Sequence, residues 1–149
     1  MREIKFRGQI RDDDRWVYGN LTDNLFGEPI IVSRSAIASG PLGLFGQHSE
    51  KVIEQTIGQF AGISDKNGKE AYEDDLVRVL ISPIRCGALT IGHPFDLVGR
   101  IVFNSPTARW LIVFPTNEIG LISQEFGWAG HEFEVIGNAH EHPSLLNNQ

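Results

Sequence analysis

The residues best suited to chemistry lie near the C-terminus, where histidines and carboxylates gather in a short stretch. They are His131, Glu132, Glu134, His140, Glu141 and His142. Imidazole and carboxylate groups are common ligands of zinc and other divalent ions. On a strand His140 and His142 would share a face, but no helical HExxH spacing occurs and His142 precedes Pro143 in an expected turn. We interpret His131, His140 and His142 as solvated strand-edge residues, with a metal-dependent hydrolase as the alternative.

An acidic group in the middle of the chain is the next candidate for chemistry. Its members are Asp65, Glu70, Glu73, Asp74 and Asp75. Paired carboxylates can act as general acid and base or hold a cation. The spacing does not match a calcium-binding loop, so a solvated turn is the favoured interpretation.

The single cysteine, Cys86, is a third candidate. Neighbouring Arg85 would favour its thiolate, but no base close in sequence could activate a nucleophile there. No serine lies in a GxSxG elbow, and no glycine-rich phosphate loop is present. One cysteine also excludes an internal disulfide. The sequence therefore predicts no catalytic residue and no cofactor.

Arginine beside an aromatic ring suggests a different class, the small barrels that stack on single-stranded nucleic acid. The candidate residues are Arg7, Arg15, Trp16, Arg109 and Trp110. The formal net charge of −6 opposes this hypothesis because an acidic surface repels phosphate. Nucleic-acid binding is therefore the alternative and not the leading interpretation.

Length and composition are those of an ordinary soluble protein. The chain has 149 residues, of which 41% are hydrophobic and 21% charged, enough for one domain or two small lobes. No apolar run approaches the roughly 20 residues that span a bilayer, and Met1–Lys5 lacks the apolar core of a signal peptide. We expect a cytoplasmic protein without membrane contact.

Short alternating or apolar runs predict about eight strands and no long helix. The expected strands are Glu3–Arg7, Arg15–Gly19, Ile30–Val32, Thr56–Ile63, Leu76–Ile81, Val98–Phe103, Arg109–Phe114 and His131–Gly137. Ile119–Ile122 is either a further strand or the start of a short segment capped by Ser123. Asn67-Gly68 predicts a hairpin turn, and Pro143 predicts a short helical turn through Leu146. The architecture that suits these elements is antiparallel β, closed or partly closed so that few edges stay open.

Two stretches fit no regular element, and both contain apolar residues. Residues 26–48 include Leu42, Leu44 and Phe45, and residues 82–96, which read as irregular, include Ile84 and Phe95. Apolar side chains on loops can contact a partner, although folding back onto the core is the commoner outcome. These five residues are the predicted partner-contact residues.

Three motifs resemble the YopX-like family of bacteriophage and prophage proteins. They are Met1–Arg7 with Trp16-Val17-Tyr18, then Ile57–Glu70 continuing through Tyr72–Val77, and finally Glu134–Asn138 with Glu141, Pro143, Leu145 and Leu146. The family usually has Gly where Asp74 stands here, Thr for Ala61 and Asn for His142. Asp tolerates the left-handed region better than most residues, so we expect the turn at Asp74 to be kept.

The resemblance implies a mainly β protein whose C-terminal part is a small Src-homology-3-like barrel with very little helix. We expect an N-terminal lobe of hairpin and loop over residues 1–54 and a barrel lobe over 55–149. The family brings no catalytic residues to transfer. The leading hypothesis is a non-catalytic, phage- or prophage-encoded interaction protein. Its partner would be an unknown protein or a second copy of the chain.

Overall fold

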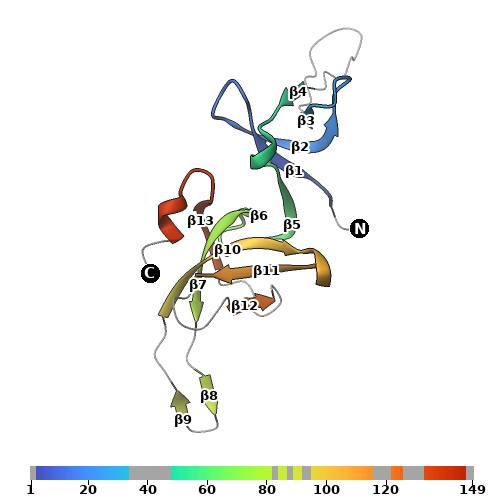
Figure 1. Cartoon of the computed structure of the whole chain (residues 1–149). Coiled ribbons are helices and arrows are strands. Elements are labelled where there is room, and N and C mark those ends of the chain that lie inside the picture. The colour runs from blue at the N-terminus through green and yellow to red at the C-terminus, as the bar shows by residue number, and fades with distance from the viewer. Residues whose placement is uncertain are drawn as a thin grey trace. The chain divides into compact units, whose positions relative to one another are not determined.

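The computed structural model describes residues 3–33, 48–81, 84–86, 89–91, 95–115, 122–125 and 133–146. Over these ranges the chain is mainly antiparallel β, and its only helical elements are short 3-10 turns (Figure 1). The predicted fold class is therefore confirmed. No helix in these ranges is long and apolar enough to cross a membrane. The chain divides into two compact units, Met1–Gly62 and Ile63–Gln149.

A six-stranded sheet has the order β4-β3-β2-β1-β5-β6, and all of its strands except β6 (Glu70–Tyr72) begin in the first unit. The elements that begin in the first unit are β1 (Phe6–Gln9), β2 (Trp16–Asp23), β3 (Pro29–Ser33), β4 (His48–Lys51), the 3-10 turn η1 (Glu54–Thr56) and β5 (Gly58–Ser64). The residues that follow β4 also pair with those that follow β1, because Val52 bridges Ile10 and the Arg11 amide donates to the Lys51 carbonyl at 3.1 Å. Strands β1 to β4 thus close a ring of antiparallel pairings.

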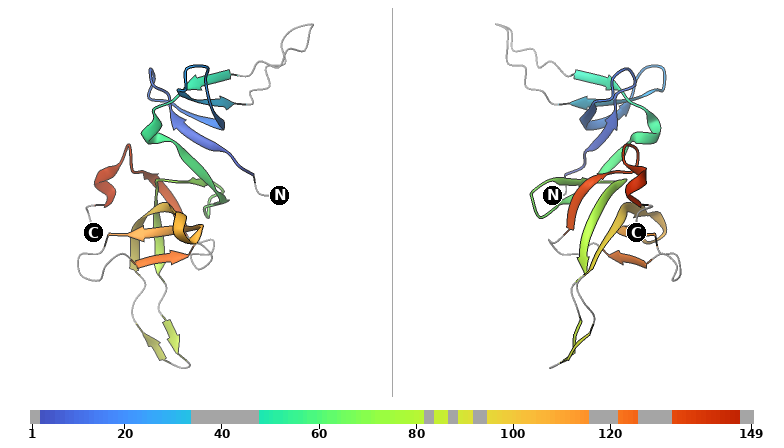
Figure 2. Two further views of the ribbon diagram at one scale, coloured as in Figure 1. Left: turned by 45° about the vertical axis from the view of Figure 1, so that its right-hand side comes forward. Right: turned by 90° about the vertical axis from the view of Figure 1, so that its left-hand side faces the viewer.

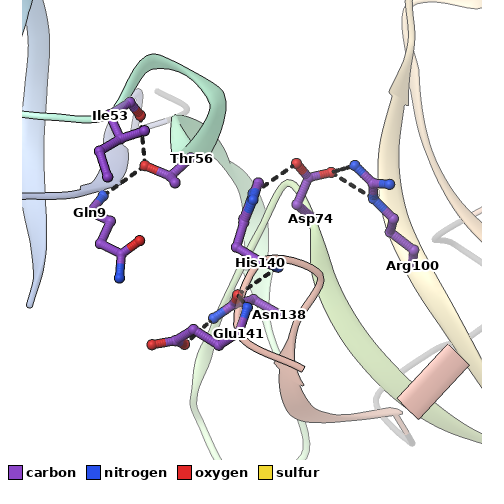
Figure 3. A network of polar contacts seen from close by, with 8 residues as sticks. All are labelled: Gln9, Ile53, Thr56, Asp74, Arg100, Asn138, His140 and Glu141. Carbon is purple, nitrogen blue, oxygen red and sulfur yellow. Dashed lines mark hydrogen bonds and ion pairs between the residues drawn. The ribbon is translucent and has the colours of Figure 1, made fainter. Parts of the chain in front are cut away.

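Gly8, which has no side chain, allows the core of the first unit to pack closely. Ile31 and Val52 are fully buried. A Cβ atom at Gly8 would lie 2.9 Å from the Val52 Cβ, closer than real Cβ atoms come, and in a tight contact of 3.2 Å with the Ile31 Cδ1. The Thr56 hydroxyl then ties η1 to β1 by accepting from the Gln9 amide at 2.9 Å (Figure 3).

The central sheet of the second unit has the order β12-β11-β10-β7-β13, and β8 and β9 form a separate hairpin (Figure 2). The elements of the second unit are β6 (Glu70–Tyr72), β7 (Asp75–Ile81), β8 (Ile84–Cys86), β9 (Leu89–Ile91), β10 (Phe95–Asn104), η2 (Ser105–Thr107), β11 (Arg109–Phe114), β12 (Ile122–Glu125), β13 (Phe133–Asn138) and η3 (Pro143–Leu146). The prediction that residues 82–96 are irregular was wrong where β8 and β9 pair.

One face of this sheet forms the core of the second unit. Val77, Ile101 and Ile112 are fully buried on adjacent strands. A Cβ atom at Gly99 would lie 2.5 Å from the Ile112 Cγ2. Glycine at position 99 therefore allows β10 to pack this closely against the Ile112 side chain. The described pairings leave β12 and β13 at the two edges of the sheet. Closure into a Src-homology-3-like barrel therefore stays a prediction.

The turn after β5 is built around the Asp65 carboxylate. Its Oδ1 accepts from the Asn67 and Lys69 amides at 2.8 and 2.9 Å. Its Oδ2 accepts from the Val135 amide of β13 at 3.0 Å, 70 residues away in sequence. The predicted Asn67-Gly68 turn is confirmed, with Gly68 supplying the positive φ of 81°. One side chain therefore closes the turn and joins it to β13.

Asp65 is 7% exposed, and its surroundings act on its ionisation in two directions. Burial opposes the charged form, but the Val135, Lys69 and Asn67 amides stabilise it more, so the pKa of Asp65 lies below its usual value. A carboxyl whose pKa is lowered by folding stabilises the fold above its unfolded pKa. That contribution is lost as the pH falls through the folded value.

We expect Asp65→Asn to lower the free energy of unfolding at pH 7 by about 2 kcal/mol. The amide nitrogen cannot accept the hydrogen bond that one carboxylate oxygen now accepts, and a buried amide group loses its partner. The variant should also lose less stability than the wild type between about pH 5 and pH 2. Urea unfolding followed by circular dichroism across this pH range measures both effects.

The exposed carboxylate of Asp96 provides the control, since Asp96→Asn removes an equal charge from the surface. The free energy of unfolding of Asp96→Asn should lie within about 0.5 kcal/mol of the wild-type value. Equal effects of the two substitutions would show that Asp65 contributes only its charge, and would contradict the role assigned to its hydrogen bonds.

Candidate functional site

A cluster of charged side chains lies at the β6–β7 turn of the second unit. Asp74 occupies this turn with a φ of 67°, in the left-handed region expected for it. Its Oδ1 accepts from the Arg100 Nε at 2.8 Å and lies 2.6 Å from the Arg100 Nη2, while its Oδ2 lies 3.2 Å from the His140 Nε2 (Figure 3). Asp74 thus bridges β10 and the segment that follows β13.

That segment is shaped by the Asn138 side chain. Its Oδ1 accepts from the His140 amide at 3.0 Å and the Glu141 amide at 2.9 Å, and its Nδ2 donates to the Glu141 carboxylate (Figure 3). The Asn138 carbonyl accepts from the His142 amide at 2.9 Å. The His142 ring lies against Gly137, where a Cβ atom would come within 2.9 Å of its Nδ1. Asn138 therefore ends β13 and begins a tight turn.

The histidines predicted as metal candidates are only partly described. His140 and His142 lie in the turn after β13 and not on a strand, so the strand geometry considered for them was wrong. His131 lies outside the described residues. Within the described ranges, no group of three or more His, Cys, Asp and Glu side chains could hold a metal ion. What the structure brings together is His140, Asp74 and Arg100, an arrangement that links segments of the fold.

The acidic residues predicted as a solvated turn are in part buried, which corrects that interpretation. Asp75 is 1% exposed, and its Oδ2 accepts from the Tyr72 amide at 2.8 Å. Glu70 accepts from the Tyr72 hydroxyl at 2.8 Å. With Asp65 accepting three amides, these carboxylates act as hydrogen-bond acceptors that hold turns. For buried Asp65 and Asp75, backbone amides supply the hydrogen bonds that burial requires.

Of the predicted nucleic-acid residues, Arg7 and Trp16 meet in the first unit. The Arg7 guanidinium lies 4.9 Å from the centroid of the Trp16 ring, a cation–π contact, and Arg7 is only 6% exposed. Lys5 makes a similar contact with Phe60 at 4.6 Å. Phosphate binding needs exposed cationic groups, and Arg7 presents little surface to a nucleic acid.

The other nucleic-acid candidates do not extend this cluster. Arg15 is exposed, and its Nε pairs with the Asp13 carboxylate, which lowers the pKa of Asp13. Arg109 and Trp110 belong to the second unit and, as neighbours on β11, point to opposite faces. Trp110 packs edge-on against Phe103 with 5.1 Å between ring centroids. The described contacts therefore engage Arg15 and Trp110 within their own units.

The β2–β3 turn holds two residues that the sequence reading missed. Leu25 and Phe26 are 101% and 86% exposed, more than any other large apolar side chain in the described ranges. The Asn24 Oδ1 accepts from the Phe26 amide at 2.8 Å and the Glu28 amide at 3.0 Å. The Asn24 carbonyl accepts from Gly27, whose φ is 75°. The sequence signal was Asn24 followed by Gly27, with an apolar pair between them.

Glu28 fixes the base of this turn. Its carboxylate lies 2.6 Å from the Lys51 Nζ and 3.3 Å from the Arg11 Nη1, and it accepts from the Asn24 Nδ2 at 2.8 Å. The hydrogen bonds from Lys51 and Asn24 hold the pKa of Glu28 below its usual value. The turn is thus anchored to β4 through Lys51 and to the β1–β2 turn through Arg11.

The predicted partner-contact residues lie largely beyond what the structure describes. Leu42, Leu44 and Phe45 are outside the described residues. Ile84 lies in β8 and Phe95 begins β10, and at both positions only the backbone is described. Contact through these five residues stays a prediction.

The left-handed conformation of Asp74 gives a test of what the cluster contributes. We expect the free energy of unfolding of Asp74→Gly to lie within about 0.5 kcal/mol of the wild-type value. The relief of backbone strain offsets the loss of the ion pairs with partly exposed Arg100 and His140. Asp74→Ala should cost about 1–2 kcal/mol, since it keeps the strained conformation and loses the pairs. Urea unfolding measures both, and a glycine variant no more stable than the alanine variant would contradict this balance.

Three comparisons relate the chain to known proteins. The chain is 19% identical to the protein in "Crystal structure of protein EF1440 from Enterococcus faecalis", with a TM-score of 0.48 over 98% of this chain and 99% of that one. No curated protein matches the chain. The family model named YopX, for YopX protein, matches residues 5–147. Because this match spans nearly the whole chain, the protein belongs to the YopX family.

Proposed function

We propose that this chain is a non-catalytic binding protein, encoded by a bacteriophage or prophage and acting in the bacterial cytoplasm. The observation that supports this proposal is how the polar residues of the family motifs are used. Asp65 accepts three backbone amides, and Asn138 accepts two. Side chains held in this way stabilise turns and are not available to a substrate.

Binding through a rigid β framework follows from the same use of polar groups. A framework held by buried acceptors keeps its turns and strand ends in one conformation, which lowers the entropy lost when a partner binds. The acidic chain, with its net charge of −6, favours a protein partner over a nucleic acid. The near-complete burial of Arg7 points the same way.

The test is affinity capture of the tagged full-length chain from bacterial cells that express it, with and without nuclease. We expect one protein in near-stoichiometric amount, retained after nuclease treatment. Size exclusion with light scattering on the purified chain shows whether that protein is a second copy. Elemental analysis of the same sample measures bound metal.

Failure to capture any protein would contradict the proposal, and two other results would favour one of the alternatives. Recovery of nucleic acid alone, with its loss in Arg15→Ala and Arg109→Ala, would support the nucleic-acid alternative. A stoichiometric metal ion together with hydrolytic activity would support the metal-dependent alternative. Neither substitution affects a buried residue, so loss of binding would not reflect loss of folding.

A further inference from the structure

The β2–β3 turn exposes apolar surface in a place where folding does not require it. Leu25 and Phe26 are adjacent, and their exposed fractions of 101% and 86% show that the described residues cover almost none of either side chain. Single exposed apolar residues are common, but two large ones side by side at the tip of a turn form a projecting pair. Burial against a partner would remove both from water.

Hydrogen bonds hold the turn that presents this pair. Asn24 holds it from within through its carbonyl and its side-chain oxygen, which accept from Gly27, Phe26 and Glu28. The Asn24 amide also donates to the Glu28 carbonyl at 2.9 Å, which closes the hairpin. A fixed turn loses little conformational entropy on binding, which is a property of efficient anchor residues.

We propose that Leu25 and Phe26 anchor this chain in an apolar pocket, rimmed by basic side chains, on a protein partner. This inference rests on the proposed function and names the surface and the partner chemistry for it. A projecting pair fits a pocket better than a flat surface, because a pocket surrounds both side chains and excludes water from them. One turn is smaller than a standard interface, so the pair is the centre of a larger contact.

The charges around the turn favour a basic rim on the partner. Asp23 directly precedes the turn and is exposed. Asp12 and Asp14 are exposed on the β1–β2 turn, which the Arg11–Glu28 pair joins to the β2–β3 turn. The nearby cations Arg11 and Lys51 are engaged by Glu28. Arg15, on the same β1–β2 turn, pairs with Asp13, so Asp12, Asp14 and Asp23 are the carboxylates outside these ion pairs, and basic side chains would complement them.

The same charges disfavour the other possible occupants. A symmetric contact between two copies places one surface against itself, and these carboxylates would then face one another. An anionic membrane would repel the exposed carboxylates as well as the net charge of −6. A protein with a basic rim around an apolar pocket has neither problem.

Photocrosslinking of the full-length chain in bacterial cells tests the position of the contact. With p-benzoylphenylalanine in place of Phe26, we expect one crosslinked protein, and we expect none when it replaces the 63% exposed Ile4. A crosslink to a second copy, to lipid or to nucleic acid would overturn the inference. So would an equal crosslink from position 4.

Affinity measurements with the partner that crosslinking identifies test whether Leu25 and Phe26 are anchor residues. Leu25→Ser and Phe26→Ser should each weaken binding by about 30-fold or more, as anchor residues do. The matched control Ile4→Ser should change it less than about 3-fold, and equal unfolding curves for all three variants would exclude a folding defect. Unchanged affinity in both turn variants would contradict the inference.

The combined variant Asp12→Asn, Asp14→Asn and Asp23→Asn tests the basic rim. It should slow association by about 10-fold and flatten the dependence of the association rate on salt. An unchanged association rate would contradict the proposal that basic side chains surround the partner's pocket. If capture yields a protein partner but position 26 does not crosslink to it, this inference fails alone. If no protein is captured at all, the proposed function fails with it.

Discussion

The Asp65 carboxylate imposes the constraint on which the rest of the second unit depends. It lies in a turn after β5, yet it accepts the Val135 amide of β13 from 70 residues away. Two further contacts join this turn to β13. The Lys66 amide donates to the Phe133 carbonyl at 3.1 Å, and the Lys66 Nζ pairs with Glu134 at 2.8 Å. A turn that is local in sequence thereby fixes one end of the sheet.

The position of β13 then determines where the charged cluster forms. Strand β13 pairs with β7 and ends at Asn138, whose side chain turns the backbone and places His140 beside Asp74. The Ala139 amide donates to the Asp74 carbonyl at 2.8 Å, so backbone and side chains join the two turns together. His140, which has the chemistry of a catalytic or metal-binding group, is placed here by structural hydrogen bonds.

Alternation and apolar runs predicted the strands whose faces are simple. The runs at Leu76–Ile81, Val98–Phe103 and Arg109–Phe114 all lie within observed strands. The first strand shows the limit of such reading. Ile4 and Phe6 suggested a strand over Glu3–Arg7, but β1 begins at Phe6 and Ile4 is 63% exposed. The contact that sets β1 is the close approach of Gly8 to Val52, and no local pattern encodes that distance.

The burial of acidic residues could not be predicted for a related reason. Asp65 and Asp75 resemble solvated turn residues in sequence, because the amides that satisfy them are visible only in the folded backbone. Hairpin β8–β9 was missed because its strands are 3 residues each, too short to show a period. The bond from Val135 to Asp65 depends on tertiary geometry, whereas the fold class follows from local pattern.

The exposure of Leu25 and Phe26 could not be predicted from the local sequence either. An apolar pair in a sequence is expected to fold inward, and a flexible loop would allow these side chains to cover each other or the core. In the structure, the bonds of Asn24 and Glu28 hold a turn in which both side chains are exposed. Folding alone would be served as well by polar residues at both positions. The exposed pair and the hydrogen bonds that hold its turn are therefore consistent with the proposed contact with a partner.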